Sequence, residues 1–164
     1  MMKQLWAPWR MEFLKDDKTK TCDCVFCALP REKNDQTNLI VHRAKYNFVI
    51  LNKYPYNNGH LMVVPFKHTS NLGDLSKEEQ SEMMEFGNHA ISALKEAYKP
   101  EGFNLGMNLG QAAGAGIKDH LHLHIVPRWN GDTNFMPVIG DVKSMPEHLQ
   151  KSFESLKIYF GRIQ

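Results

Sequence analysis

The sequence lacks the features that mark several large classes of protein. It has only three cysteines in 164 residues. A disulfide framework usually needs more cysteines and an even number of them. No apolar run approaches the roughly 20 residues of a membrane-spanning helix. Lys and Arg number 20 against 18 Asp and Glu, a formal net charge of +2. This balance does not indicate a nucleic-acid partner, because such proteins usually carry a basic surface.

The first residues also lack an uninterrupted apolar segment. Lys3, Pro8 and Arg10 break the run, so no secretory signal is expected. With few cysteines, this favours a reducing cytoplasm, where thiols stay free. The hydrophobic content of 42% is ample for one core, and no linker or repeat is visible. We expect a single domain over residues 1–164.

Three histidines alternate with apolar residues late in the chain. His120, His122 and His124 are separated by Leu121 and Leu123. Because side chains alternate across a β-strand, the three imidazoles are expected on one face, ~6.5 to 7 Å apart at a rise of ~3.3 Å per residue. That face could bind a phosphate-sized ligand. A solvated edge strand with accidental histidines and a plain His-x-His metal site remain alternatives.

The segment 106–116, directly before the histidines, is rich in glycine. Glycine lets backbone N–H groups approach an anion closely, although glycines in a loop more often only turn the chain. Followed at once by the histidines, the segment is a candidate phosphate-binding loop.

Apolar periodicity and turn residues predict an α+β fold. Ser76 and Glu79 form a capping box before a long helix over 77–98, which Pro100 ends. Pro146 opens a second helix to Tyr159. Strands are expected at 46–51, 61–64, 103–109 and 120–127. This order suits a mainly antiparallel sheet with the long helix packed on it, plus a C-terminal helix.

The histidine run resembles the signature of the histidine-triad (HIT) superfamily of nucleotide hydrolases and transferases. The resemblance extends to Cys24-Val25-Phe26-Cys27, to the segment 59–68 and to Asn108. The blocks 5–10, 55–60 and 127–135 are similar to the bacterial branch that includes diadenosine tetraphosphate phosphorylases. The resemblance implies the same α+β fold and generally a homodimer.

The chemistry of a neutral imidazole agrees with this family. With an unperturbed pKa of ~6.5 it has a free lone pair near neutral pH and can attack phosphorus. The resemblance implies that His122 is the nucleophile and that His124 contacts the phosphate and leaving group. It places Asn108 near the phosphates, and Asn52 where relatives commonly carry a ribose-binding aspartate, although Asn52 could simply end a strand.

One departure from the family concerns the loop before the histidines. Many relatives have Gly-Gln-Ser or Gly-Gln-Thr there, whereas this chain has Gly114-Ala115-Gly116. Phosphate contacts are therefore expected from backbone N–H groups around Gly114 and Gly116, from His124, or from Lys118, which could instead simply face solvent.

The cysteines suggest a zinc site in the segment 22–27. Cys24 and Cys27 have the spacing of half such a site and would need distant ligands to complete it. The resemblance implies His68 and His120 as those ligands. Four protein ligands would make the Zn²⁺ structural. The alternative is that the cysteines are small buried residues, and Cys22 has no assigned role.

The leading hypothesis is an enzyme that cleaves dinucleoside polyphosphates at the α-phosphate through a nucleotidyl-histidine at His122. With inorganic phosphate as acceptor, diadenosine tetraphosphate would give ADP and ATP. Water as acceptor would instead release AMP from dinucleotides or nucleoside phosphoramidates. A zinc-stabilised nucleotide-binding module without significant turnover and zinc-hydroxide catalysis are further alternatives.

Overall fold

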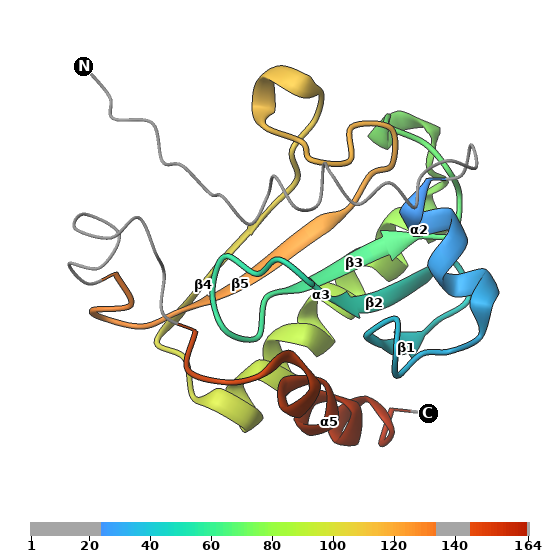
Figure 1. The fold of residues 1–164 in the computed structure, drawn as a ribbon. Coiled ribbons are helices and arrows are strands. Elements are labelled where there is room, and N and C mark those ends of the chain that lie inside the picture. The colour runs from blue at the N-terminus through green and yellow to red at the C-terminus, as the bar shows by residue number, and fades with distance from the viewer. Residues whose placement is uncertain (1–23, 134–144, 164) are drawn as a thin grey trace, which may run out of the picture.

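The computed structural model describes residues 24–133 and 145–163, which form a mixed α and β structure around one antiparallel sheet (Figure 1). The strand order is β1-β2-β3-β5-β4, and every neighbouring pair is antiparallel. The strands are β1 (Ile40–Arg43), β2 (Asn47–Leu51), β3 (Leu61–Pro65), β4 (Gly102–Gly106) and β5 (Leu123–Arg128). The predicted α+β class is confirmed.

Two helices pack beside each other and against the sheet. Helix α3 (Lys77–Tyr98) has the predicted bounds, because Ser76 and Glu79 form the full capping box at its start. Helix α5 (Leu149–Phe160) begins three residues after Pro146, where a helix start was expected, because His148 is its N-cap. Helix α5 contacts α3 and β1, so both helices contribute to one core.

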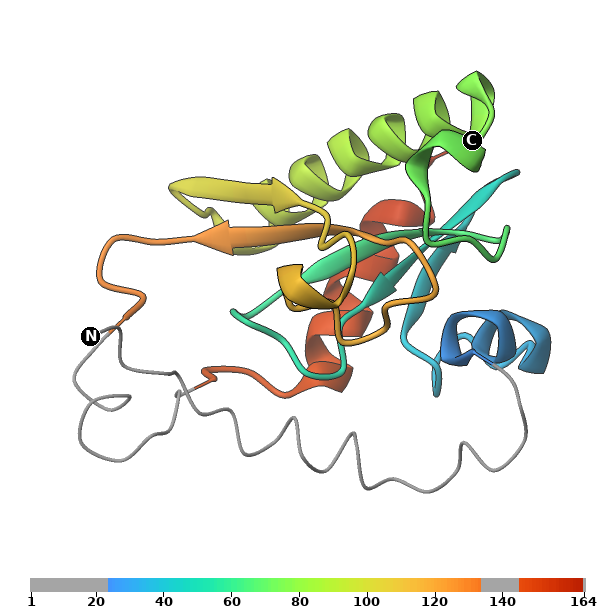
Figure 2. The same ribbon diagram turned by 90° about the horizontal axis from the view of Figure 1, so that it is seen from above.

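The sheet has a different apolar cluster on each face. The cluster under α3 and α5 includes Leu121, Leu123 and Ile125. The opposite cluster includes Phe26 and Met62. Figure 2 shows α3 on one side of the strands and the short helix α2 (Val25–Ala28) on the other. Because the leucines and Ile125 face the large helices, the alternating histidines face the side of α2.

Several elements were not predicted from the sequence. They are α2, β1 and the 3₁₀ turns η2 (Leu29–Glu32), η3 (Leu72–Asp74) and η4 (Gln111–Ala113). All are three or four residues long, too short for an apolar period to appear. The predicted strand 103–109 is also shorter in the structure, because β4 ends at Gly106.

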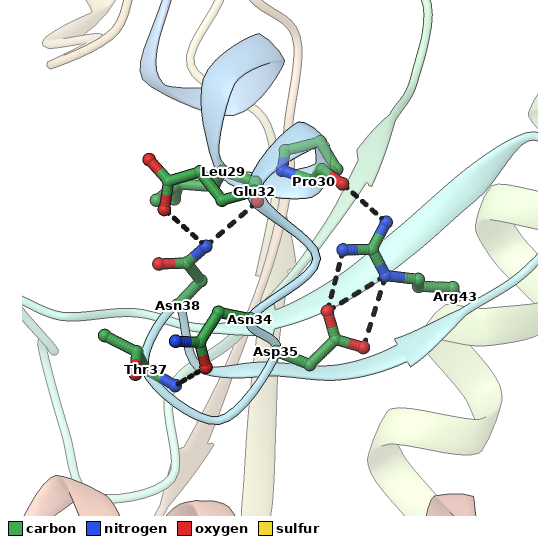
Figure 3. A network of polar contacts seen from close by, with 8 residues as sticks. All are labelled: Leu29, Pro30, Glu32, Asn34, Asp35, Thr37, Asn38 and Arg43. Atoms are coloured by element: carbon green, nitrogen blue, oxygen red, sulfur yellow. Dashed lines mark hydrogen bonds and ion pairs between the residues drawn. The ribbon is translucent and has the colours of Figure 1, made fainter.

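A polar network holds the segment after α2 against β1 (Figure 3). The Arg43 guanidinium donates to Oδ1 of Asp35 from both Nε and Nη2, at 3.0 and 2.7 Å, and from Nη1 to the carbonyl of Pro30 at 2.8 Å. Asn38 Nδ2 donates to the Leu29 carbonyl and to Glu32 Oε2, at 3.0 and 2.9 Å. These contacts fix the segment that follows α2, the helix that contains Cys27 and has Cys24 as its N-cap.

Within residues 24–133 and 145–163, no helix combines the length and apolar character needed to cross a membrane. The predicted features at Cys22, at residues 5–10 with Trp6 and Trp9, and at residues 134 and 135 lie outside the described residues.

Candidate catalytic site and metal centre

The histidine run lies at the start of β5 rather than wholly within it. The strand begins at Leu123, so the prediction of a strand from His120 was too long at that end. The physical reason is that the Leu121 N–H donates to the carbonyl of Thr69, at 2.7 Å, instead of to a neighbouring strand. The alternation of side chains nevertheless continues through the run, since Leu121 and Leu123 both lie in the same core.

The first histidine of the run belongs to a metal group. Atoms from Cys24, Cys27, His68 and His120 all lie within 4.8 Å of one another. The His120 Nδ1 atom lies 3.3 Å from Cys24 Sγ, 3.6 Å from Cys27 Sγ and 3.3 Å from His68 Nδ1. The Cys27 Sγ atom lies 3.4 Å from His68 Nδ1. The structure thus brings together the four ligands that the sequence predicted.

These distances fit zinc. Around a tetrahedral Zn²⁺, two ligating nitrogens would lie about 3.4 Å apart, and a nitrogen and a sulfur about 3.6 Å apart. The observed separations are 3.3 Å between the nitrogens and 3.3 to 3.6 Å between nitrogen and sulfur. The Sγ atoms of Cys24 and Cys27 can ligate a metal ion as thiolates. The four residues form a metal site suited to zinc, and the shell they supply is complete.

A hydrogen bond outside the ligand group orients His120. Its Nε2–H donates to the carbonyl oxygen of Pro65, at 2.8 Å, and the residue is 1% exposed. Because that nitrogen carries the proton, the neutral ring presents a lone pair at Nδ1, the atom that faces the cysteines. The end of β3 therefore sets the tautomer that metal binding requires.

His122 has a fixed orientation of its own. Its Nδ1–H donates to the carbonyl oxygen of His120, at 2.8 Å, so the neutral ring has its lone pair at Nε2. Phe26 from α2 packs against the ring, with the centroids 5.1 Å apart. Burial lowers the pKa of His122, and the hydrogen bond to the His120 carbonyl opposes that shift. The ring is thus held as a neutral imidazole with its lone pair at Nε2.

His124 lies beside His122 and contacts another buried histidine. The rings of His122 and His124 are edge to face, with centroids 4.6 Å apart. This is closer than the expected spacing of alternate strand positions, because the side chains lean toward each other above the backbone. His124 Nδ1 lies 2.9 Å from Nε2 of His60, which is fully buried.

The contact of His60 with the histidine run was not predicted from the sequence. Met62 lies opposite His124 in the β3–β5 pair. Because side chains alternate along a strand, His60, two residues before Met62, lies on the same face as Met62. Pairing cannot be read from one sequence, so this neighbourhood emerged only from the structure.

Of the predicted substrate-binding residues, Asn52 lies beside His60, and Asn108, Gly114 and Gly116 lie in the loop after β4. Asn52 follows β2, and its side chain contacts His60, with Nδ2 3.3 Å from Nδ1. Gly106 pairs with His124, so the glycine-rich loop leaves the sheet beside that histidine. Asn108 in this loop is half-buried, whereas Gly114 and Gly116 are exposed. The left-handed φ of +81° at Gly114 suits glycine.

Comparison with known proteins places this arrangement in a family. The model of the HIT domain matches residues 33–131. The chain is 40% identical to the AP-4-A phosphorylase of Mycobacterium tuberculosis strain H37Rv, over 98% of this chain and 86% of that protein.

Solved structures agree. A Zn-bound histidine triad family protein from Mycobacterium smegmatis aligns with a TM-score of 0.68 at 27% identity, covering 86% of this chain and 95% of that one. A hypothetical histidine triad nucleotide-binding protein from Sulfolobus tokodaii aligns with a TM-score of 0.65 at 28% identity, covering 84% and 89%. The chain is therefore a member of the HIT domain family.

Proposed function

We propose that the chain is an enzyme that cleaves dinucleoside polyphosphates at the α-phosphate, with inorganic phosphate as the acceptor. The carrying observation is the orientation of His122, whose Nδ1–H is bound to the His120 carbonyl and whose Nε2 is left as the nucleophile. The 40% identity to a protein named AP-4-A phosphorylase supports the substrate class. Diadenosine tetraphosphate would then be converted to ADP and ATP.

The reaction has two displacements at the same phosphorus. In the first, the lone pair of His122 Nε2 attacks the α-phosphorus, and the bond to the bridging oxygen breaks, releasing ATP and leaving AMP on the histidine. In the second, an oxygen of inorganic phosphate attacks the same phosphorus, and the phosphorus–nitrogen bond breaks to give ADP. The covalent intermediate thus divides the reaction into two displacements, so inorganic phosphate does not have to attack the dinucleotide directly.

The remaining site residues take supporting parts in this proposal. His124 and the loop residues Asn108, Gly114 and Gly116 border the phosphates, and backbone N–H groups of the loop supply donors. The ribose contact of Asn52 stays a prediction. Cys24, Cys27, His68 and His120 would hold a structural zinc that keeps the strand start rigid. Zinc-hydroxide catalysis is disfavoured because four protein ligands leave no open position.

The test is product analysis with the zinc-loaded chain. Diadenosine tetraphosphate is incubated with and without inorganic phosphate, and the nucleotides are resolved by ion exchange. ADP plus ATP that form only with phosphate would support the proposal. AMP plus ATP without phosphate would replace it by a hydrolase, and binding without turnover would replace it by a nucleotide-binding module.

Two variants complete this test. His122→Asn should abolish turnover and the covalent AMP adduct seen by intact-protein mass spectrometry. The control is His148→Asn, because His148 is an exposed histidine at the N-cap of α5, outside the site. An active His122→Asn protein would exclude the nucleotidyl-histidine pathway.

Three further parts of the proposal concern the whole chain. Residues 1–164 form one domain, with the segment 22–27 as its zinc-binding part. A zinc site that uses cysteine thiolates suits a reducing compartment, for which the cytoplasm is proposed. The expected homodimer is to be tested by light scattering. An exposed sheet edge at β4, with Leu105 42% and Leu109 50% exposed, supports it.

A further inference from the structure

His60 and His124 form a buried imidazole pair next to the proposed nucleophile. Nε2 of His60 lies 2.9 Å from Nδ1 of His124, and the two residues are 0% and 8% exposed. At this distance one nitrogen must donate and the other must accept. Which one donates decides where the proton of His124 lies, and this determines what His124 can offer a substrate.

The backbone around Tyr56 decides the direction. The Tyr56 N–H, which can only donate, points at His60 Nδ1 at 3.1 Å. A second donor converges on the same atom. The Oδ1 of Asn52 accepts from the Tyr54 N–H at 2.9 Å, and this turns Nδ2 toward His60 Nδ1, at 3.3 Å. His60 Nδ1 is therefore an acceptor and carries no proton.

The proton positions of both rings follow from that acceptor. A neutral His60 without a proton at Nδ1 carries it at Nε2 and donates it to His124 Nδ1. Because His124 Nδ1 accepts, the neutral His124 ring carries its own proton at Nε2. Burial, together with His124 and His122, holds the pKa of His60 well below its usual value, which keeps His60 neutral.

We propose that Asn52, Tyr56 and His60 form a relay that fixes His124 as a neutral Nε2–H donor to the oxygens of the attacked phosphate. This inference rests on the proposed function and names Asn52 and His60 as positioning residues within it. The donor stabilises charge on the phosphate and does not transfer its proton. A transfer would leave an imidazolate, and the departing polyphosphate is stable as an anion without it.

The relay gives Asn52 a task different from the ribose contact expected of the aspartate in relatives. An asparagine supplies an N–H to His60, whereas a carboxylate supplies only acceptors. A carboxylate at this position would draw a proton to His60 Nδ1, against the Tyr56 N–H. A neutral His60 would then present a lone pair to His124, and the proton of His124 would move to its own Nδ1.

The first test reads the proton positions directly and does not depend on turnover. Long-range ¹⁵N–¹H spectra of the zinc-loaded chain with ¹⁵N-labelled histidine distinguish the two tautomers and the imidazolium. Signals are assigned by their loss in His60→Gln and His124→Gln variants. We expect Nε2–H tautomers at both residues at neutral pH. A proton at Nδ1 of either residue would overturn the relay, whatever the substrate proves to be.

The second test compares two variants of Asn52 in zinc-loaded protein. Asn52→Asp should move the proton of His60 to Nδ1 in the spectra. It should lower kcat by about 10²-fold, the usual cost of losing one donor to a reacting oxyanion. Asn52→Ala leaves the Tyr56 N–H in place, so its loss of kcat should be much smaller. If Asn52→Asp keeps the parent spectra and kcat while Asn52→Ala only raises KM, Asn52 is a ribose ligand and the relay fails.

Discussion

The carbonyl oxygen of His120 accepts the Nδ1–H of His122 at 2.8 Å, so a metal ligand orients the proposed nucleophile through its own backbone. His120 is in turn held by Pro65 at the end of β3. Displacement of His120 would therefore change the direction of the His122 lone pair without altering its chemistry. The geometry of the metal site and the orientation of the proposed nucleophile are therefore coupled through His120.

The first prediction concerns loss of the metal. Cys27→Ala should remove zinc, lower the melting temperature by many degrees and reduce kcat. Structural zinc binds small peptides with roughly 10 kcal/mol or more of apparent free energy. Zinc content by atomic absorption and thermal unfolding with and without a chelator check this. His148→Ala is the matched control and should bind zinc normally. Parent-like stability in zinc-free Cys27→Ala protein would contradict a structural metal.

A second prediction concerns the carboxylate of Glu82 on α3. It accepts from the backbone N–H groups of Lys45, Tyr46 and Asn47 at 3.1, 2.8 and 2.9 Å, which fixes the turn between β1 and β2. Glu82→Gln should lower the free energy of unfolding by about 1 to 3 kcal/mol, because donors lose a charged acceptor. Urea denaturation measures the change. The exposed Glu85→Gln variant should show almost none, and equal effects would exclude this role of Glu82.

The third prediction tests the turn before His60. Gly59 has a φ of +74°, and an added Cβ would lie 2.8 Å from Leu94 Cδ2. Gly59→Ala combines left-handed strain with a steric clash and should cost about 1 to 3 kcal/mol of stability. It should also lower activity by displacing His60. Gly102→Ala, where no atom lies within 4 Å of the added Cβ, is the control for chemical denaturation and kinetics. A neutral Gly59→Ala would mean that the turn readily relaxes.

The fourth prediction is a pH dependence of stability at His42. Burial lowers its pKa from 6.5, Lys157 and His89 lower it further, and Glu82 opposes them. The unfolded chain therefore takes up this proton first as the pH falls. The stabilising contribution is present above about pH 6.5 and declines toward the folded pKa. His42→Phe keeps the ring against Phe86, 4.8 Å away, but cannot titrate.

The measurement for His42 is the free energy of unfolding of both proteins at about pH 8 and about pH 5. The parent should lose more stability on acidification than the His42→Phe protein. Ionisations that do not involve His42 cancel in the difference between the two proteins. Identical pH dependence in the two proteins would show that His42 does not contribute.

The parts of the fold that could be predicted are those with a strong local signal. Helix α3 was placed at its correct bounds because Ser76 and Glu79 form a complete cap and the apolar positions recur over many turns. The core strands β2 and β3 were recognised from apolar runs. The strand β1 was missed because it has only four residues, two of them His42 and Arg43, and it is stabilised by pairing with β2.

The candidate site divides in the same way. The grouping of Cys24 and Cys27 with His68 and His120 was predicted correctly. The spacing of the cysteines indicated only half of a metal site, and the family resemblance supplied the two histidines. The hydrogen bonds that set the imidazole tautomers could not be predicted. They depend on backbone atoms of Tyr56, Pro65 and His120. Backbone N–H and carbonyl groups occur whatever the side chain is, so the sequence does not indicate which of them accept or donate these bonds.

The spread of the metal ligands along the sequence has a consequence for biosynthesis. Cys24 and His120 are 96 residues apart, and His68 lies between them. A nascent chain emerges from its N-terminus, so a chain that has emerged only as far as β4 offers three of the four ligands. Its coordination shell is therefore open and exchangeable. Only the arrival of the segment that carries His122, the proposed nucleophile, closes the shell. We therefore expect zinc to be retained firmly only once the proposed catalytic histidines are in place.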